Sequence, residues 1–341
     1  HGADPTGVSD STTAFQNAGL SSLTPYALDG QYLITGSIPL RDNQHWMLGE
    51  GARLQITGTT VEVFTVDVGI DEWSITGGTV FYSPGTVINT AAATIPYSNV
   101  RFTCMGPIDA CTVQMPNSGT FPSMFIATSI NRVSFEGLKF DGNFINTLAA
   151  YQIGVNATTV SGLEVKDSHF VRWGFLGAPV FTGGGSGYYD SAALKCATCT
   201  QARIHHNRFP SNWVGDIVGS GNGADIHDNQ HGTPLLTEVG TVANYWDTMA
   251  GGLTSVSWSN SDAVQIHDNQ TWGANRFWTS TWGIGNPILA NKLTHSIISG
   301  NTVTGMTPLP GVCTISGTGV TCTQAIFNSS LDVGMGFECE S

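Results

Sequence analysis

The sequence predicts an all-β fold, a right-handed parallel β-helix (solenoid), because one short phrase recurs along the chain. The phrase Ile-His-Asp-Asn-Gln occurs at 226–230 and at 266–270, and looser copies lie at 133–140, 163–170, 204–209 and 297–303. Apolar and polar residues alternate within each copy, as in a strand with one face turned inward. A unit this short cannot bury its apolar face alone, so the copies must stack on one another.

The spacing of the copies agrees with stacked coils. Aligned on the Asn position, they fall at 168, 207, 229, 269 and 301, at intervals of 39, 22, 40 and 32 residues. We interpret the shortest interval as one plain coil and the longer ones as coils that carry loops. An Asn at the same corner of each coil can hydrogen-bond its own turn and the Asn of the next coil. The 42 glycines suit a fold with many tight turns.

Three regions are expected. Residues 1–30 form an N-terminal cap, 31–304 the parallel β-helix, and 305–341 a C-terminal cap or oligomer contact. Within the first region, residues 4–20 are typical of a turn followed by a short helix. Ser9, Asp10 or Ser11 would cap that helix, and an apolar stripe containing Phe15 would cover the open end of the solenoid.

Composition excludes several functions. The net charge is −13 with only 12 Lys and Arg, which argues against nucleic acid and anionic membrane surfaces as partners. No apolar run approaches the ~20 residues of a membrane span, so no membrane insertion is expected. Cross-hairpin disulfides are expected for Cys104–Cys111 and Cys313–Cys322 and would indicate an oxidising compartment, whereas Cys196 and Cys199 are expected to pack inside a coil.

The start of the chain carries a family resemblance. Residues 2–12 (GADPTGVSDST), continued to Gly49-Glu50-Gly51, resemble the N-terminal signature of the pectate-lyase-like superfamily. That superfamily has the right-handed parallel β-helix fold and includes phage tailspike depolymerases and secreted polysaccharide lyases, hydrolases and epimerases. The resemblance implies a glycan as partner and an extracellular location, secreted or on a phage virion. If the chain is a tailspike, it also implies a homotrimer.

Aromatic residues concentrate where such a protein would bind sugar rings. Six of the nine Trp lie between 213 and 282, close to several Tyr. Flat aromatic side chains stack on sugars, although they also pack loops onto a solenoid wall. The expected substrate-binding residues are Tyr188, Tyr189, Trp213, Trp246, Trp272, Arg276 and Trp278.

Glycosidic hydrolysis needs two carboxylates, which we expect on the outer face of the solenoid. Asp190 and Asp216 each precede an Asn turn, by 17 and 13 residues, so we expect them near one wall of adjacent coils without strict stacking. Coils rise about 4.8 Å each, so such acids can reach the ~5–9.5 Å separations of glycosidase pairs. Glu238 and Asp247 are further candidates. All four could instead be turn acids that cap backbone amides.

The repeated histidines and aspartates suggest structure rather than chemistry. Asp228, Asp268, His227 and His267 recur in the repeated phrase, whereas catalysis needs one site and not a ladder. Zinc ligation by His205, His206, His227, His231 and His267 is an alternative, but outward residues of a solenoid line up regardless. No metal or cofactor is therefore predicted, with Ca²⁺ relevant only to a lyase.

The expected function is hydrolysis of glycosidic bonds in an extracellular or cell-surface polysaccharide. One alternative is a lyase or epimerase, which would need a base and a cation beside a uronate carboxylate. Arg172, Lys195, Arg203, Arg208 and Arg276 could supply charge, but basic residues are scarce, which favours hydrolysis. The other alternative is a non-enzymatic glycan-binding adhesin or spike, for which the aromatic residues suffice.

Overall fold

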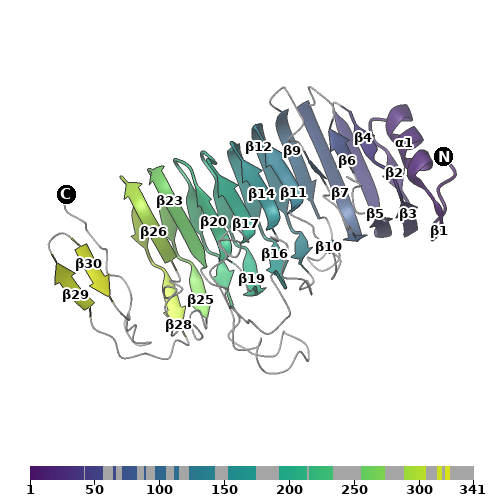
Figure 1. The fold of residues 1–341 in the computed structure, drawn as a ribbon. Coiled ribbons are helices and arrows are strands. Elements are labelled where there is room, and N and C mark those ends of the chain that lie inside the picture. Colours follow the sequence, from purple (N-terminus) through teal and green to yellow (C-terminus); the bar gives the residue numbers. More distant parts are fainter. Residues whose placement is uncertain are drawn as a thin grey trace, which may run out of the picture.

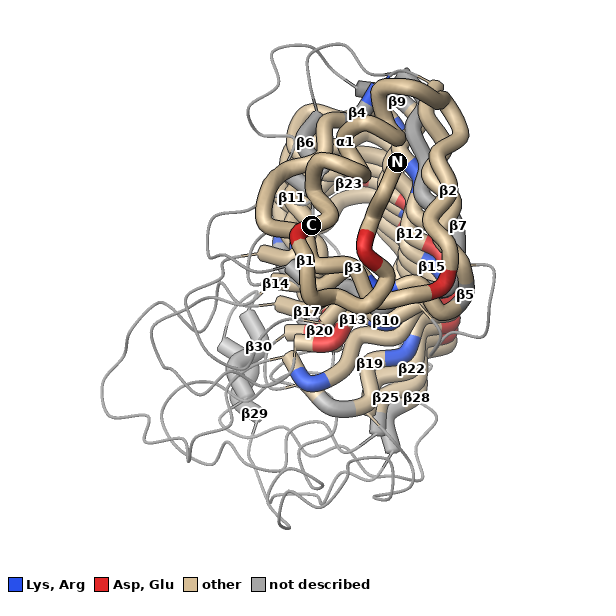
Figure 2. The backbone as a smooth tube through the Cα atoms, turned by 90° about the vertical axis from the view of Figure 1, so that its right-hand side faces the viewer, with Lys and Arg blue, Asp and Glu red and all other residues tan. Residues whose placement is uncertain are grey.

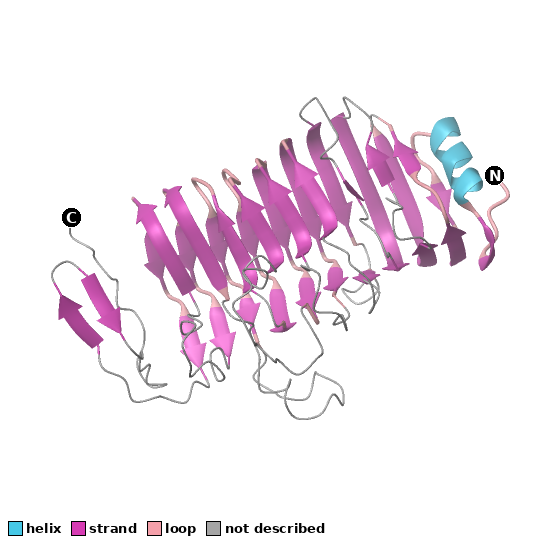
Figure 3. Cartoon of the chain, viewed as in Figure 1, coloured by secondary structure: helices cyan, strands magenta, loops and turns pink. Residues whose placement is uncertain are grey.

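A computed structural model of the chain describes residues 1–41, 43–56, 64–66, 71–82, 88–89, 97–104, 111–114, 123–142, 153–173, 192–212, 215–232, 255–272, 288–304, 313–316 and 319–322. Figures 1 and 3 show strands laid side by side along one long axis, with α1 (Thr12–Ser21) at the N-terminal end. The part of the chain so described holds no helix long and apolar enough to span a bilayer.

The strands form a right-handed parallel β-helix, as predicted. One wall is a nine-stranded parallel sheet. Its strands are β4 (Ile38–Leu40), β6 (Phe64–Val66), β8 (Ile88–Asn89), β11 (Ser123–Thr128), β14 (Ile153–Thr158), β17 (Ala192–Ala197), β20 (Gly215–Ser220), β23 (Val256–Asp262) and β26 (Ile288–Thr294).

A 19-stranded sheet supplies the other two walls and bends between them. The middle row contains β2 (Tyr26–Ala27), β5 (Gln44–Ile56), β7 (Asp71–Tyr82), β9 (Tyr97–Thr103), β12 (Ile130–Glu136), β15 (Ser161–Lys166), β18 (Arg203–His205), β21 (Asp225–His227), β24 (Gln265–His267) and β27 (Ile297–Ser299). The third row contains β1 (Thr6–Asp10), β3 (Gly30–Ile34), β10 (Thr112–Gln114), β13 (Lys139–Asp141), β16 (His169–Val171), β19 (Arg208–Ser211), β22 (Gln230–His231), β25 (Gln270–Trp272) and β28 (Thr302–Thr304).

Two strands show that these rows are one sheet. β5 and β7 are long enough to run through both rows, and their register shifts between Leu48 and Ala52, where the sheet bends. Seen from the N-terminal end, the rows surround a single interior (Figure 2). A separate antiparallel hairpin joins β29 (Cys313–Ser316) to β30 (Gly319–Cys322).

The repeated phrases stack in register. Ile204 lies opposite Ile226, which lies opposite Ile266, and the outward His205, His227 and His267 pair in the same way. The sequence alignment on the Asn position therefore gives the true register of these coils. It holds because a slip of one residue would turn every inward side chain outward.

The predicted Asn ladder is present at the corner between the middle and third rows, which we call the Asn corner. The Asn229 side-chain NH₂ donates to the Ile204 carbonyl at 2.8 Å and to the Asn269 side-chain oxygen at 3.0 Å. Its own side-chain oxygen accepts from the backbone N–H of Asn207 at 3.1 Å. The ladder continues from Asn207 to the Ser168 N–H and from Asn269 to Asn301. Each side-chain amide thus bonds the turn backbone of the preceding coil and the Asn side chain of the next one.

The residue before each ladder position has a left-handed backbone. This row of turn residues comprises Gly137, Asp167, His206, Asp228, Asp268 and Gly300, with φ between 50° and 71°. Gly adopts this region without strain, and Asp and His are enriched there among other residues. The repeated Asp of the phrase therefore has a structural reason, as predicted from its repetition.

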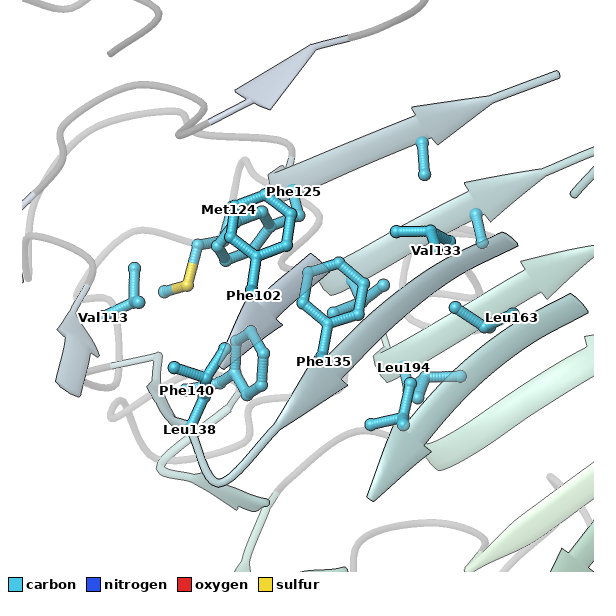
Figure 4. Close-up of a cluster of buried hydrophobic side chains, with 14 of the residues drawn as sticks. Phe102, Val113, Met124, Phe125, Val133, Phe135, Leu138, Phe140, Leu163 and Leu194 are labelled. Carbon is cyan, nitrogen blue, oxygen red and sulfur yellow. The ribbon is translucent and has the colours of Figure 1, made fainter. Parts of the chain in front are cut away.

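Aromatic side chains fill the interior. Phe140 stacks on Phe170 with ring centres 4.5 Å apart, and Phe170 stacks on Phe209 at 5.0 Å. Figure 4 shows Phe102, Phe125, Phe135 and Phe140 pointing into the same interior from neighbouring strands, and all of these rings are buried. Offset stacks of this kind add to the hydrophobic stabilisation of each coil.

The N-terminal helix is found, but a strand precedes it. α1 begins after Ser11, whose side chain makes no cap hydrogen bond; the Asp10 carboxylate instead accepts from the Thr12 N–H at 3.0 Å. Phe15 stacks on Trp46 at 5.8 Å and so covers the end of the interior. The preceding residues form β1 because they pair with β3, a tertiary contact that the turn-like composition did not reveal.

The glycines that carry the family resemblance also have a structural reason. A Cβ added to Gly49 would lie 2.2 Å from a carboxylate oxygen of Asp29. The same oxygen accepts from the Gly51 N–H at 3.0 Å. Only glycine permits this close approach between two coils.

Cysteine placement agrees with the sequence analysis where it is described. Cys104 and Cys111 form a disulfide. Cys196 and Cys199 are free thiols buried inside a coil, as expected. Cys313 and Cys322 lie opposite each other in the β29–β30 hairpin, so the expected pairing stays a prediction.

We expect Asn229→Ala to destabilise the protein by about 3 kcal/mol, because it leaves the Asn207 N–H and the Ile204 carbonyl buried without partners. Urea unfolding would measure the loss. Asn301→Ala is the matched control, since Asn301 makes the same contacts to Asn269 and Ile266 but is only half-buried. Water can replace its bonds, so an equal loss in both variants would contradict a stabilising role for ladder burial.

Candidate functional site

We call the corner at which the third row meets the nine-stranded sheet the loop corner. In chain order, the residues predicted to bind and cleave a glycan belong to the segments that connect these two rows or to the strands beside them. Tyr188, Tyr189 and Asp190 lie in the chain between β16 and β17, Trp213 between β19 and β20, Glu238, Trp246 and Asp247 between β22 and β23, and Arg276 and Trp278 between β25 and β26. These nine residues lie outside the described part of the chain. Trp272 ends β25, and Asp216 is the second residue of β20.

Asp216 is part of a buried polar network at the base of the loop corner. Its carboxylate accepts from the Asn212 side-chain NH₂ at 2.9 Å and is hydrogen-bonded to His231 Nδ1 at 2.8 Å. Asn212 also donates to the Phe170 carbonyl at 3.0 Å, and its side-chain oxygen accepts from the Trp173 N–H at 3.1 Å. The network therefore ties three coils together at their ends.

The position of Asp216 corrects one expectation. The carboxylates of the site were expected on the outer face, but the Asp216 and His231 side chains have no exposed surface. Ala193 lies opposite Asp216 in the neighbouring strand, because Ala192 pairs with Gly215 and Leu194 pairs with Ile217. Asp190 precedes Ala193 by three residues in the sequence and lies outside the described part of the chain, so its expected position relative to Asp216 stays a prediction.

His231 continues the aromatic stack into this polar network. Its ring lies parallel to Phe209 with centres 4.9 Å apart, and Thr271 follows it in the register of β25. Thr271 in turn hydrogen-bonds to Ser255 at 3.3 Å. The interior beside the loop corner therefore changes from aromatic to polar between β19 and β25.

Burial shifts the pKa of the carboxyl at the centre of this network. Burial raises the pKa of the Asp216 carboxyl above its usual value, and the hydrogen bonds to His231 and Asn212 oppose part of that rise. The Nε2 atom of His231 is buried and has no hydrogen-bond partner in the described structure.

Two of the cations considered for a lyase lie beside carboxylates. Arg172 forms a two-pronged ion pair with Asp141, one bond of which is 2.8 Å long. Arg203 lies 3.8 Å from Glu164, an exposed and looser contact. Arg208 is exposed, and Arg276 lies outside the described residues.

Sequence reasoning missed Asn212 and grouped His231 with the wrong residues. The five histidines considered together for zinc do not meet: His205, His206, His227 and His267 lie at the outer surface, whereas His231 points inward. The usable signal was that His231 follows the Asn phrase at the position where the preceding coil has Phe209. An imidazole at an aromatic core position requires a buried partner.

We expect Asp216→Asn to change how stability depends on pH. A carboxyl with a raised folded pKa binds its proton more tightly in the folded state, so its contribution to stability falls as pH rises above its usual value of 3.8. The free energy of unfolding of the wild type minus that of the variant should therefore decrease as the pH rises above about 3.8.

Asp262→Asn provides a control of opposite sign. Hydrogen bonds from Thr294 and His295 lower the pKa of the exposed Asp262 carboxyl. The corresponding difference should be constant above about pH 3.8 and should decrease as the pH falls below that value, because this contribution is lost when the carboxylate is protonated. Chemical denaturation at several pH values measures both, and parallel curves for the two variants would contradict the burial of Asp216.

Comparison with known proteins gives the fold. No family model and no curated protein matches the chain. Among solved structures, a mutant tailspike protein of E. coli bacteriophage HK620 in complex with pentasaccharide aligns at a TM-score of 0.51 and 12% identity, over 88% of this chain and 55% of that one.

Two further structures align less closely. PfbA, a surface adhesin of Streptococcus pneumoniae, aligns at a TM-score of 0.42 and 12% identity, over 89% and 77% of the two chains. The A-module of the Azotobacter vinelandii mannuronan C-5 epimerase AlgE4 aligns at 0.39 and 14% identity, over 89% and 87%. The stacked parallel sheets, the Asn ladder and the similarity to the tailspike identify the chain as a parallel β-helix protein of the pectate-lyase fold.

Proposed function

We propose that the protein interacts with an extracellular or cell-surface glycan and hydrolyses its glycosidic bonds. The observation that supports this most is the order of the elements along the chain: the candidate acids and aromatic residues belong to the segments between the third row and the nine-stranded sheet, or to strands beside them, in four successive coils. The tailspike with a similar fold was solved in complex with a pentasaccharide, which agrees with a glycan partner.

The proposed roles follow from chemistry. Asp190, Glu238 and Asp247 are the candidates for general acid and for base or nucleophile. They belong to coils that rise about 4.8 Å each, which is compatible with the ~5–9.5 Å separations of glycosidase carboxylates. Asp216 is buried, so we assign it a positioning role through Asn212 and His231. The tyrosines and tryptophans of the corner would stack on sugar rings.

Hydrolysis fits better than β-elimination because few cations are available. Elimination needs a positive charge beside the uronate carboxylate. Arg172 is already committed to Asp141, and Lys166 lies 3.0 Å from Glu136. A Ca²⁺ ion would be required only if the protein proved to be a lyase.

A panel of neutral and uronate-containing polysaccharides tests the proposal, with new reducing ends and absorbance near 235 nm measured together. We expect reducing ends without absorbance. Asp190→Asn, Glu238→Gln and Asp247→Asn should identify two residues whose loss lowers turnover by roughly 10²-fold or more. Asp167→Asn, a turn residue at the Asn corner that tolerates Asn, should leave turnover unchanged.

The other outcomes decide between the alternatives. Absorbance at 235 nm would overturn hydrolysis in favour of a lyase. Glycan binding without either signal would indicate an adhesin or spike. Loss of turnover in the Asp167→Asn control alone would show that the loop corner is not the site.

We further propose an extracellular location and a homotrimer. The Cys104–Cys111 disulfide supports an oxidising compartment. The trimer rests on the resemblance to tailspikes. Light scattering of the purified protein measures its mass, and a monomer at working concentration would contradict the assembly.

A further inference from the structure

A group of side chains that can ligate a metal ion lies at the Asn corner. One short strand of the third row separates this corner from the loop corner. His205 ends β18, and His206 is the left-handed residue that follows it. His227 and Asp228 occupy the same two positions one coil further on. The four side chains thus come from the outer surface of two adjacent coils and have no part in the proposed glycan chemistry.

Their donor atoms are close enough to share one ion. One atom each from His206, His227 and Asp228 lie within 4.8 Å of one another. His227 Nδ1 is 2.8 Å from an Asp228 carboxylate oxygen, and His206 Nε2 is 3.9 Å from the same oxygen. Two ligands that each stand about 2.0–2.2 Å from a zinc ion are roughly 3–4 Å apart. Small side-chain rotations therefore suffice to place all three on one ion.

His205 adds a further nitrogen beside this trio. Its Nδ1 lies 2.9 Å from His206 Nδ1, and its ring is parallel to that of His227 with centres 4.9 Å apart. His205 and His227 are largely covered, whereas His206 and Asp228 are about half exposed. Two ligands are thus held by the solenoid wall, and two can adjust from the solvent side.

Carboxylates stand behind the two held imidazoles. The far nitrogen of His205 lies 3.5 Å from Glu164, and that of His227 lies 3.9 Å from Asp225. Ligating histidines commonly present their second nitrogen to a carboxylate, which orients the ring and strengthens the ligand. This arrangement points the Nδ1 atoms of both rings toward His206 and Asp228.

Stacking along the solenoid does not by itself explain the cluster. The left-handed position is Gly137, Asp167, Asp228, Asp268 and Gly300 in the other repeats, and only the 204–209 repeat has a histidine there. One coil further on, His267 stacks on His227 at 4.9 Å, but its two nitrogens lie beside Asp268 and Asp225 and the turn position there holds Asp268 in place of a second histidine. The nitrogen-rich set occurs once among the described coils.

We propose that His206, His227 and Asp228, assisted by His205, bind a divalent transition metal of the zinc class. A set of imidazoles with one carboxylate suits Zn²⁺, Co²⁺, Ni²⁺ and Cu²⁺ better than Ca²⁺ or Mg²⁺, which prefer oxygen ligands. The ion would join β18 to β21 across the surface. It would stabilise the folded chain without contacting the loop corner.

Zinc titration followed by calorimetry tests the site, with Co²⁺ absorbance in the visible region as an independent report of nitrogen ligation. We expect one saturable ion per chain and a rise in the thermal unfolding midpoint with added Zn²⁺. His206→Asn should weaken binding by roughly 10-fold or more. Asn accepts the left-handed backbone, so the turn itself is retained.

The chain offers a close control in His295. This residue is also a left-handed histidine, with φ of 46°, and its Nδ1 lies 2.8 Å from an Asp262 carboxylate oxygen. His295→Asn should bind zinc as the wild type does. Asp228→Asn, which removes the anionic ligand and keeps the turn, should weaken binding like His206→Asn.

Three results would overturn the proposal. They are no saturable zinc in the wild type, unchanged affinity in both His206→Asn and Asp228→Asn, or loss of binding in His295→Asn. Because the readouts are metal stoichiometry, cobalt absorbance and thermal unfolding, they do not depend on whether the protein cleaves a glycan.

Discussion

The structure depends on hydrogen bonds that run along the solenoid rather than around it. At the Asn corner, a buried side-chain amide accepts from the turn of the preceding coil and donates to a strand carbonyl of that coil. Because each amide serves two coils, the turns cannot shift independently. The register of the strands on either side, and the aromatic stack in the interior, follow from that constraint.

This constraint positions the histidine cluster at the Asn corner and the polar network at the loop corner. The left-handed turn row puts small or polar residues at the outer surface of the Asn corner, where His206 and Asp228 face each other from neighbouring coils. The third row then leads every coil to the loop corner. There the interior becomes polar at Asp216 and His231, which belong to a buried hydrogen-bond network. Asp216 lies in β20, directly after one of the connections that contain the candidate residues.

The fold was predictable because its determinants repeat in the sequence. The phrase that ends at Asn229 and again at Asn269 contains, at consecutive positions, the inward Ile, the outward His, the turn Asp and the ladder Asn. Each has the role that its position implies. The site was less predictable. Asp216 belongs to no repeat, and strand alternation says nothing about burial beside a corner. Its partners Asn212 and His231 are 4 and 15 residues away in sequence and meet it only through coil stacking.

The histidine cluster was also only partly predictable from the sequence. Sequence reasoning considered His205, His206 and His227 together with two further histidines, but their repetition favoured a structural role, and His231 could not be separated from the outward set. A shift of one position along a strand changes an inward side chain into an outward one. The distance between donor atoms in adjacent coils depends on how the coils stack and cannot be deduced from their spacing in the sequence.

The unequal spacing of the ladder has an evolutionary consequence. Successive ladder positions are separated by 22 residues in one coil and by 40 in the next, yet the amides meet with the same 3.0 Å contacts. Lengthening a connection between fixed ends costs only about 0.6 kcal/mol for each doubling of its length. Selection can therefore insert, lengthen or exchange segments at the loop corner almost without thermodynamic penalty. Such a chain can acquire a new specificity while the frame that folds it stays constant.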